Sequence, residues 1–151
     1  MKQIPLLRTG CVPLRSLDNA WQVCLVNTTS DRGQLIFPRG KVEDGESLQQ
    51  GALRETYEEA GLRGALIATP IFADRKGRIT PSDDAGYCYF PLLVEEELTS
   101  WPEETLRRRH WTLIEEALAA ENCAALRQIL STVRESCLDW CRERLIPLVL
   151  K

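Results

Sequence analysis

The sequence is most informative at Gly40-Lys-Val-Glu-Asp-Gly-Glu46-Ser-Leu-Gln-Gln-Gly-Ala-Leu-Arg54-Glu55-Thr-Tyr-Glu58-Glu59-Ala-Gly-Leu62. Ser47 is a typical helix N-cap, and Gln50 three residues later completes a capping box. Gly61 is the residue type that most often follows the last turn of a helix. These signals predict a helix over residues 47–60.

Three carboxylates share one side of this predicted helix. At about 100° per residue, Glu55, Glu58 and Glu59 fall within an arc of about 100°. Like charges at this spacing repel one another unless a cation lies among them, and hard oxygen ligands favour Mg²⁺ or Mn²⁺. Such an ion usually completes its coordination with phosphate oxygens and water. The alternative interpretation is a solvated acidic helix face.

The other sides of the helix are expected to anchor it. Leu53, Thr56 and Ala60 form a neighbouring face that can pack on a sheet. Gly51 lies one turn before Glu55 on the acidic stripe, although glycine costs a helix about 1 kcal/mol relative to alanine. We interpret Gly51 as leaving space for a ligand or a metal shell.

Short runs of β-favouring residues surround the helix. Asp18-Asn19 is a turn signal, so the runs on either side of it predict a hairpin. Apolar residues that recur every three or four positions predict an amphipathic helix over residues 122–145. The expected strands cover residues 8–15, 21–26, 35–37, 65–72, 87–94 and 109–113. This order predicts a single α/β (α+β) domain over residues 1–151, with a mixed β-sheet flanked by helices.

The composition of the 151-residue chain excludes several classes of protein. With 19 basic and 22 acidic residues, the chain lacks the basic excess of a general nucleic-acid binder. No apolar run approaches the roughly 20 residues of a membrane span, and the N-terminus does not resemble a signal peptide. We therefore expect no membrane partner, no nucleic acid unless a capped RNA, and a cytoplasmic location that can extend to the nucleus.

The cysteines are expected to be buried, reduced thiols. No Cys-x-x-Cys motif occurs, and the single histidine, His110, is distant from the cysteines in sequence. A disulfide or zinc role is therefore disfavoured, and the compartment is expected to be reducing. The six cysteines are Cys11, Cys24, Cys88, Cys123, Cys137 and Cys141.

Residues 40–62 resemble the Nudix box, G-x5-E-x7-R-E-U-x-E-E-x-G-U, in which U is a bulky apolar residue. The fixed positions match, and the departure is Thr56 at a U position, where the hydroxyl could bond back to the helix backbone. The resemblance implies a Nudix-like α/β/α sandwich that hydrolyses a nucleoside diphosphate linked to another moiety, or a related phosphoanhydride. Glu46 resembles the loop glutamate of the box, with a secondary role. An inactive Nudix binding module would usually have lost box carboxylates.

The resemblance also implies roles for the box residues, with Mg²⁺ or Mn²⁺ as the cofactor. Glu55, Glu58 and Glu59 would bind the metal together with the backbone carbonyl of Gly40. Glu58 could instead accept the proton of the attacking water, and the two roles stay open. Arg54 would form ion pairs with the glutamates and orient them. The expected catalytic residues are thus Glu58, Glu55 and Arg54.

The flanking sequence resembles two subfamilies. Diphosphoinositol polyphosphate phosphohydrolases share a basic run before a tryptophan, as in residues 106–111, and asymmetrical diadenosine tetraphosphate hydrolases resemble residues 37–43. We expect a small-molecule polyphosphate substrate from one or both classes and a monomer or small homo-oligomer. The alternative is another nucleotide pyrophosphatase, acting on nucleoside triphosphates, ADP-ribose or a cap.

The two substrate classes would need different side chains. A diphosphoinositol polyphosphate requires several basic side chains to bind its phosphates, whereas a dinucleoside polyphosphate requires aromatic rings on which its nucleobases can stack. A further carboxylate from residues 95–97 or 103–104 could join the metal shell. The basic candidates for substrate binding are Arg8, Arg39, Lys41, Arg75, Lys76, Arg78, Arg107 and Arg108. The aromatic candidates are Trp21, Phe72, Tyr87 and Tyr89.

Overall fold

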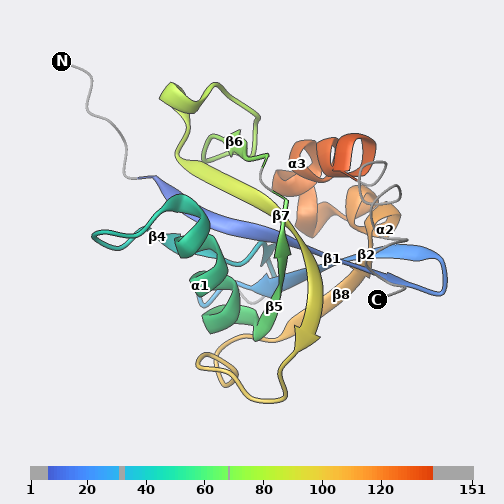
Figure 1. Cartoon of the computed structure of the whole chain (residues 1–151). Coiled ribbons are helices and arrows are strands. Elements are labelled where there is room, and N and C mark those ends of the chain that lie inside the picture. The colour runs from blue at the N-terminus through green and yellow to red at the C-terminus, as the bar shows by residue number, and fades with distance from the viewer. Residues whose placement is uncertain (1–6, 31–32, 68, 138–151) are drawn as a thin grey trace.

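A computed structural model of the chain describes residues 7–30, 33–67 and 69–137 (Figure 1). Its elements are β1 (Arg8–Leu17), β2 (Ala20–Asn27), β3 (Leu35–Ile36), β4 (Arg39–Lys41), α1 (Leu48–Ala60), β5 (Leu62–Leu66), β6 (Ile71–Ala73), the 3₁₀ turn η1 (Ser82–Asp84), β7 (Tyr87–Glu97), β8 (Arg109–Leu113), α2 (Ile114–Ala119), the 3₁₀ helix η2 (Glu121–Leu126), α3 (Arg127–Thr132) and the π-helical turn η3 (Val133–Cys137).

The strands form one mixed sheet. Its main order is β3-β2-β1-β7-β5, with β4 beside β1, β6 beside β7 and β8 beside β2. Strands β1 and β7 run parallel, whereas the other neighbouring strands of the described sheet pair antiparallel. The beginnings of β1 and β7 therefore meet at the same edge of the sheet.

The two faces of the sheet carry different helices. Cys11 of β1 packs with Ala52 of α1 on one face. Val12, the next residue, points to the opposite face and packs in a cluster with Ile129 of α3. Figure 1 accordingly shows α1 on one side of the sheet and α2 and α3 on the other. The expected mixed sheet flanked by helices is confirmed.

The hairpin and the ends of α1 also follow the sequence signals. Asp18 and Asn19 both have positive φ, at 52° and 65°, as a two-residue hairpin turn requires. Ser47 and Gln50 form both hydrogen bonds of the capping box, and Gly61 ends the helix in the left-handed conformation at φ 64°. These features depend on residues within a few positions of one another, which is why the sequence predicts them.

The anchoring face of α1 differs partly from the expected one. Thr56 is buried and its hydroxyl donates to the Ala52 carbonyl at 2.8 Å, as its place in the box suggested. Ala60 is buried too, but Leu53 is 39% exposed. Ala52 takes the place of Leu53 in the packed face, because it points directly at β1.

The strands around the box were only partly predicted. The expected strand over residues 65–72 is two strands, β5 and β6, and Pro70 between them has no N–H to donate to a sheet ladder. The strand at residue 35 ends at Ile36. After Pro38 the chain forms β4, which the sequence did not predict and which places Gly40 opposite Thr9 of β1.

The long helix expected over residues 122–145 is confirmed in part, because α3 lies within it and buries Ile129 and Leu130 as the apolar spacing predicts. The chain forms η2, α3 and η3 in succession, and residues 138–145 lie outside the described residues. In η2, buried Cys123 and Leu126 lie three residues apart, which matches a 3₁₀ helix. Arg127 donates to the Leu118 carbonyl at 2.9 Å and so ties this segment to α2. No helix in the described part is long and apolar enough to cross a membrane.

Four cysteines match the expectation of buried free thiols. They are Cys11, Cys24, Cys88 and Cys123. Burial raises the pKa of the first three thiols to about 12, so they stay protonated at neutral pH. The side chain of Cys137 and the whole of Cys141 lie outside the described part of the chain.

Candidate active site

Arg54 lies at the centre of the acidic residues. Its guanidinium donates to Glu46 at 2.7 Å and to Glu55 at 2.8 Å. It also contacts both carboxylate oxygens of Glu58 at 3.2 Å and the Lys41 carbonyl at 2.9 Å. One cation therefore contacts three carboxylates, which offsets their mutual repulsion and holds them together.

Glu46 is held in the loop before α1. The backbone N–H of Glu43 donates to it at 3.0 Å, and Arg54 holds the pKa of its carboxyl at about 2. A Cβ on Gly51 would lie 2.7 Å from Thr9 Cγ2 and 2.9 Å from Glu46 Oε1. The interpretation of Gly51 as space for a metal shell is therefore wrong. Glycine is needed there because α1 packs closely against β1 and Glu46.

Glu55 lies against the backbone of β4. A Cβ on Gly40 would overlap the carboxylate of Glu55, so a glycine is required at this position. The Glu55 side chain is only 13% exposed. The structure thus brings together two of the expected metal ligands, although β4 itself was not predicted.

Glu59 is the buried member of the group, with 3% of its surface exposed. Its carboxylate accepts from the backbone N–H of Arg39 at 3.1 Å and lies 3.6 Å from the Arg107 guanidinium. Burial raises the pKa of the Glu59 carboxyl, against the opposing effects of Arg107 and of the Arg39 N–H. Glu59 therefore faces away from Arg54 and toward β4 and the loop before β8.

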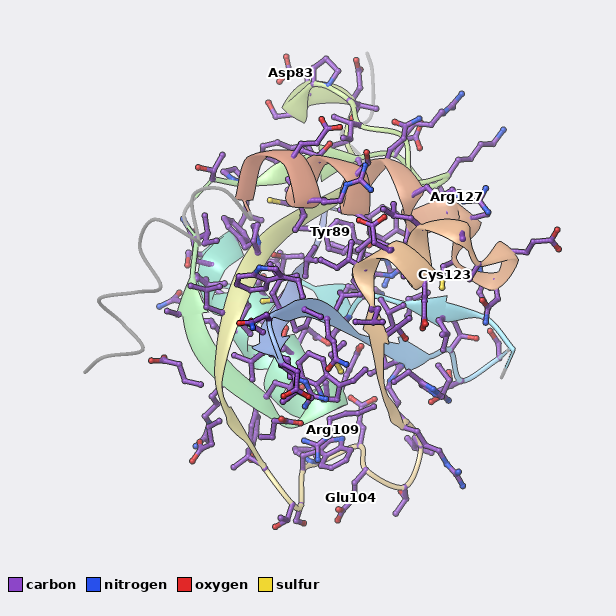
Figure 2. The ribbon with its side chains drawn as sticks, turned by 90° about the vertical axis from the view of Figure 1, so that its right-hand side faces the viewer. Asp83, Tyr89, Glu104, Arg109, Cys123 and Arg127 are labelled. Carbon is purple, nitrogen blue, oxygen red and sulfur yellow. The ribbon has the colours of Figure 1, made fainter. Side chains whose placement is uncertain are left out.

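The C-terminal end of α1 is tied to residues 98–109. The carbonyls of residues 58–61 accept hydrogen bonds from the backbone N–H of Glu103, the indole N–H of Trp101 and the guanidinium of Arg109, at 2.9–3.3 Å. Carbonyls at the end of a helix have no partner within the helix itself. This segment therefore holds the last turn of α1, which carries Glu58 and Glu59. Figure 2 shows Arg109 just above the loop that carries Glu104.

A cavity of about 550 Å³ adjoins the acidic group. Four basic candidates line it, namely Arg8, Arg39, Arg75 and Arg107. Arg39 and Arg107 also contact Glu59, so the cavity and the carboxylates share a wall. The remaining lining residues are Thr28, Thr29, Ser30, Ile36, Gly86 and Tyr87.

The other basic candidates are not brought to this cavity. Lys41 is exposed on β4, and Lys76 is exposed in the turn before η1. In the same turn, Arg78 forms an ion pair with Asp74 at 2.8 Å. Arg108 lines a second cavity instead.

This second cavity, of about 670 Å³, adjoins the first at the loop that follows β2. Thr28 and Thr29 line both cavities. The second cavity adds Leu106 and His110 from the end of the long loop and the start of β8. The polar loop after β2 therefore forms a shared wall, a role that its sequence did not indicate.

The aromatic candidates are mostly covered. Tyr87 lines the first cavity, but the Arg39 guanidinium lies 4.5 Å above its ring and Tyr89 stacks beside it at 6.0 Å. Trp21 and Phe72 pack against the core clusters. None of the four aromatic candidates offers the first cavity a fully open ring face.

The donor set fits a hard divalent cation. Within the described ranges, no three acidic, histidine or cysteine side chains are grouped to hold a metal ion as they stand, since Arg54 lies among them. However, this single guanidinium is shared by three carboxylates, so negative charge is in excess around it. Excess negative charge on oxygen donors is the chemistry that Mg²⁺ and Mn²⁺ bind.

The carboxylates outside the box separate into two places. Glu96 and Glu97 lie at the far end of β7, where they pair with Arg63 and Arg15. Glu103 lies next to the acidic group, because its carboxylate contacts Arg107 at 3.0 Å.

Trp101 and Arg109 were missed by sequence reasoning. The general need of a helix end for hydrogen-bond donors was the available signal, but it does not say which distant loop supplies them.

Comparison with known proteins finds a family model and relatives that match most of the chain. A family model described as the NUDIX domain matches residues 5–133. Nudix hydrolase 16, mitochondrial, of Arabidopsis thaliana is 33% identical over 132 residues, which cover 78% of this chain and 72% of the relative. Diphosphoinositol polyphosphate phosphohydrolase 2 of Rattus norvegicus is 36% identical over 121 residues, covering 77% of this chain and 63% of the relative.

Solved structures share the fold. The crystal structure of C. elegans Ap4A hydrolase superposes with a TM-score of 0.63 at 20% identity, covering 90% of this chain and 98% of that one. The NUDIX domain of Shewanella oneidensis NrtR, in complex with ADP-ribose, gives a TM-score of 0.64 at 15% identity, with 89% of each chain covered. At these identities the likeness concerns the arrangement of sheet and helices.

Proposed function

The chain belongs to the NUDIX domain family of Nudix hydrolases, and from this premise we propose that it hydrolyses a phosphoanhydride bond of a small polyphosphate with the help of Mg²⁺ or Mn²⁺. The observation that carries the proposal is the shared wall between the arginine-lined cavity and the carboxylates. Polyphosphate oxygens need cations along the chain and a metal at the bond that breaks, and the two halves of this site supply both.

The residues of the box have separate roles in the proposed reaction. Glu55, Glu58, Glu59 and the Gly40 carbonyl would hold the metal, which when bound polarises phosphoryl oxygens and lowers the pKa of water. Arg54 orients Glu55 and Glu58 through its hydrogen bonds. Glu58 is half-exposed and can either bind metal or accept the proton of the attacking water.

The lining of the first cavity favours a highly charged substrate that has no nucleobase. Four arginines line it, and the ring of Tyr87 is covered by Arg39. Such a lining suits several phosphate groups better than a stacked nucleobase. Together with the 36% identity to a protein named diphosphoinositol polyphosphate phosphohydrolase 2, this favours a diphosphoinositol polyphosphate as the substrate.

The second cavity supports a second substrate class. A diadenosine polyphosphate has two bulky ends, and the neighbouring 670 Å³ cavity with Leu106 and His110 offers room for one of them beyond Thr28 and Thr29. The first cavity would then hold the phosphate chain.

A substrate panel with purified protein tests the proposal. Diphosphoinositol pentakisphosphate, diadenosine tetraphosphate, nucleoside triphosphates, ADP-ribose and capped RNA are each incubated with Mg²⁺, and the products are identified. We expect turnover of the first, the second or both. Excess chelator should abolish turnover, and added Mg²⁺ should restore it. Turnover that persists in chelator would overturn the metal-dependent mechanism.

Arg75 and Lys76 form a matched pair that tests the cavity. Arg75 lines it, whereas its neighbour Lys76 is exposed outside it. Arg75→Ala should raise KM for the inositol substrate by about 10-fold, since a charge-assisted hydrogen bond contributes about 1.5–3 kcal/mol and tenfold corresponds to about 1.4 kcal/mol. Lys76→Ala should change KM by less than about twofold. Equal changes in steady-state kinetics would contradict this assignment of the cavity.

A further inference from the structure

Tyr89 lies in the interior of the molecule rather than at the site. It is 2% exposed, belongs to β7 and packs edge-on against Phe37 at 5.1 Å. Figure 2 shows it between the sheet and α3. A purely packing role would be filled equally well by phenylalanine, so its hydroxyl requires a separate explanation.

That hydroxyl accepts a hydrogen bond from the Arg39 guanidinium at 2.8 Å. The guanidinium also lies 4.5 Å above the ring of Tyr87, which stacks on Tyr89 with an interplanar angle of 4°. Arg39 is therefore held at one point by a hydrogen bond and along its flat face by a ring.

The sheet register makes this contact possible. Gly10 of β1 is opposite Arg39 of β4 on one side and opposite Tyr89 of β7 on the other. A Cβ on Gly10 would lie 2.8 Å from the Cβ of Arg39. Because this middle position has no side chain, the arginine can reach across a whole strand to the buried hydroxyl.

Arg39 differs from Arg54 and Arg107 in the charge of the group that holds its guanidinium. Arg54 and Arg107 contact carboxylates, which offset much of their charge. Within the described residues, no carboxylate forms an ion pair with the Arg39 guanidinium, and its anchor is neutral. Burial raises the pKa of Tyr89 to about 12, so the hydroxyl stays uncharged.

We propose that Tyr89 is a positioning residue, whose hydroxyl holds the Arg39 guanidinium at the cavity wall with its positive charge available for a substrate phosphate. The inference rests on the proposed function, because it assigns Arg39 to phosphate binding beside Glu59. Tyr89 itself does not touch the substrate. Its removal should therefore weaken substrate binding and leave the chemical step intact.

The test is Tyr89→Phe, which removes the hydroxyl and keeps the ring. KM for the substrate identified in the panel should rise about 3- to 10-fold with kcat within about twofold, as the loss of one hydrogen bond worth about 0.5–1.5 kcal/mol implies. The matched control is Tyr57→Phe, since Tyr57 on α1 packs under Arg63 away from the cavity. Denaturant unfolding of each variant shows whether the fold is retained.

A double-mutant cycle with Arg39→Ala distinguishes positioning from a general structural effect. In the Arg39→Ala background, Tyr89→Phe should raise KM by less than about 1.5-fold. An unchanged KM in the single variant, a lower kcat alone, or an equal effect with and without Arg39 would each overturn the proposal.

Calorimetric titration with inorganic tripolyphosphate in chelator supplies a readout that needs no turnover. Tyr89→Phe should raise its Kd by the same 3- to 10-fold, and an unchanged Kd would contradict the positioning role. If the wild-type protein hydrolyses nothing in the panel, the proposed function fails, while this titration still decides the role of Tyr89.

Discussion

Replacing Glu58 or Glu59 by glutamine is expected to lower kcat by about 10²-fold or more while the protein stays folded. Glutamine keeps the size of the side chain but removes the negative charge that a metal ligand or a proton acceptor must carry. In the Glu59 variant the amide oxygen can still accept the hydrogen bond from the Arg39 N–H, so the local structure is kept while the negative charge is lost. Steady-state kinetics with Mg²⁺ measure the loss of kcat, and circular dichroism shows whether the variants stay folded.

Glu116→Gln serves as the control for these variants. Glu116 is an exposed glutamate on α2, so its replacement should leave kcat within about twofold and stability within about 0.5 kcal/mol. Wild-type kcat in both the Glu58 and Glu59 variants would show that the chemistry takes place elsewhere.

Arg54→Ala should lower both stability and activity. Its guanidinium contacts Glu46, Glu55 and Glu58, and its removal leaves their charges to repel one another. Breaking a buried ion pair costs about 3–5 kcal/mol, and since Arg54 is 23% exposed we expect about 1–3 kcal/mol in the free energy of unfolding. We expect kcat to fall by about 10- to 100-fold, because small displacements of reacting groups are costly.

Two further variants sharpen this expectation. Arg54→Lys should recover only part of either loss, because an ammonium group cannot contact three carboxylates with the fork geometry of a guanidinium. Arg63→Ala removes an exposed arginine that lies 3.6 Å from Glu96, and it should change stability by less than about 0.5 kcal/mol. Denaturant unfolding in chelator measures these differences without added metal. Equal stabilities for the Arg54 and Arg63 variants would show that the network does not stabilise the fold.

The sequence by itself determined the local features of this protein. The ends of α1 at Ser47 and Gly61 depend on hydrogen bonds within one helical turn, and the Asp18-Asn19 turn depends on the φ angles of two residues. The acidic stripe follows from helical periodicity, as does the contact of Arg54 with Glu58 four residues later. In each case the interacting atoms are brought together by the regular geometry of one element.

Only the tertiary structure decided which distant residues complete the site. Arg75 lines the cavity and Lys76 does not, because successive residues of a turn point in different directions. Arg39 reaches Tyr89 because the register of three strands places Gly10 between them. These contacts depend on strand order and packing across the whole sheet, and composition and periodicity along the chain contain no direct record of either.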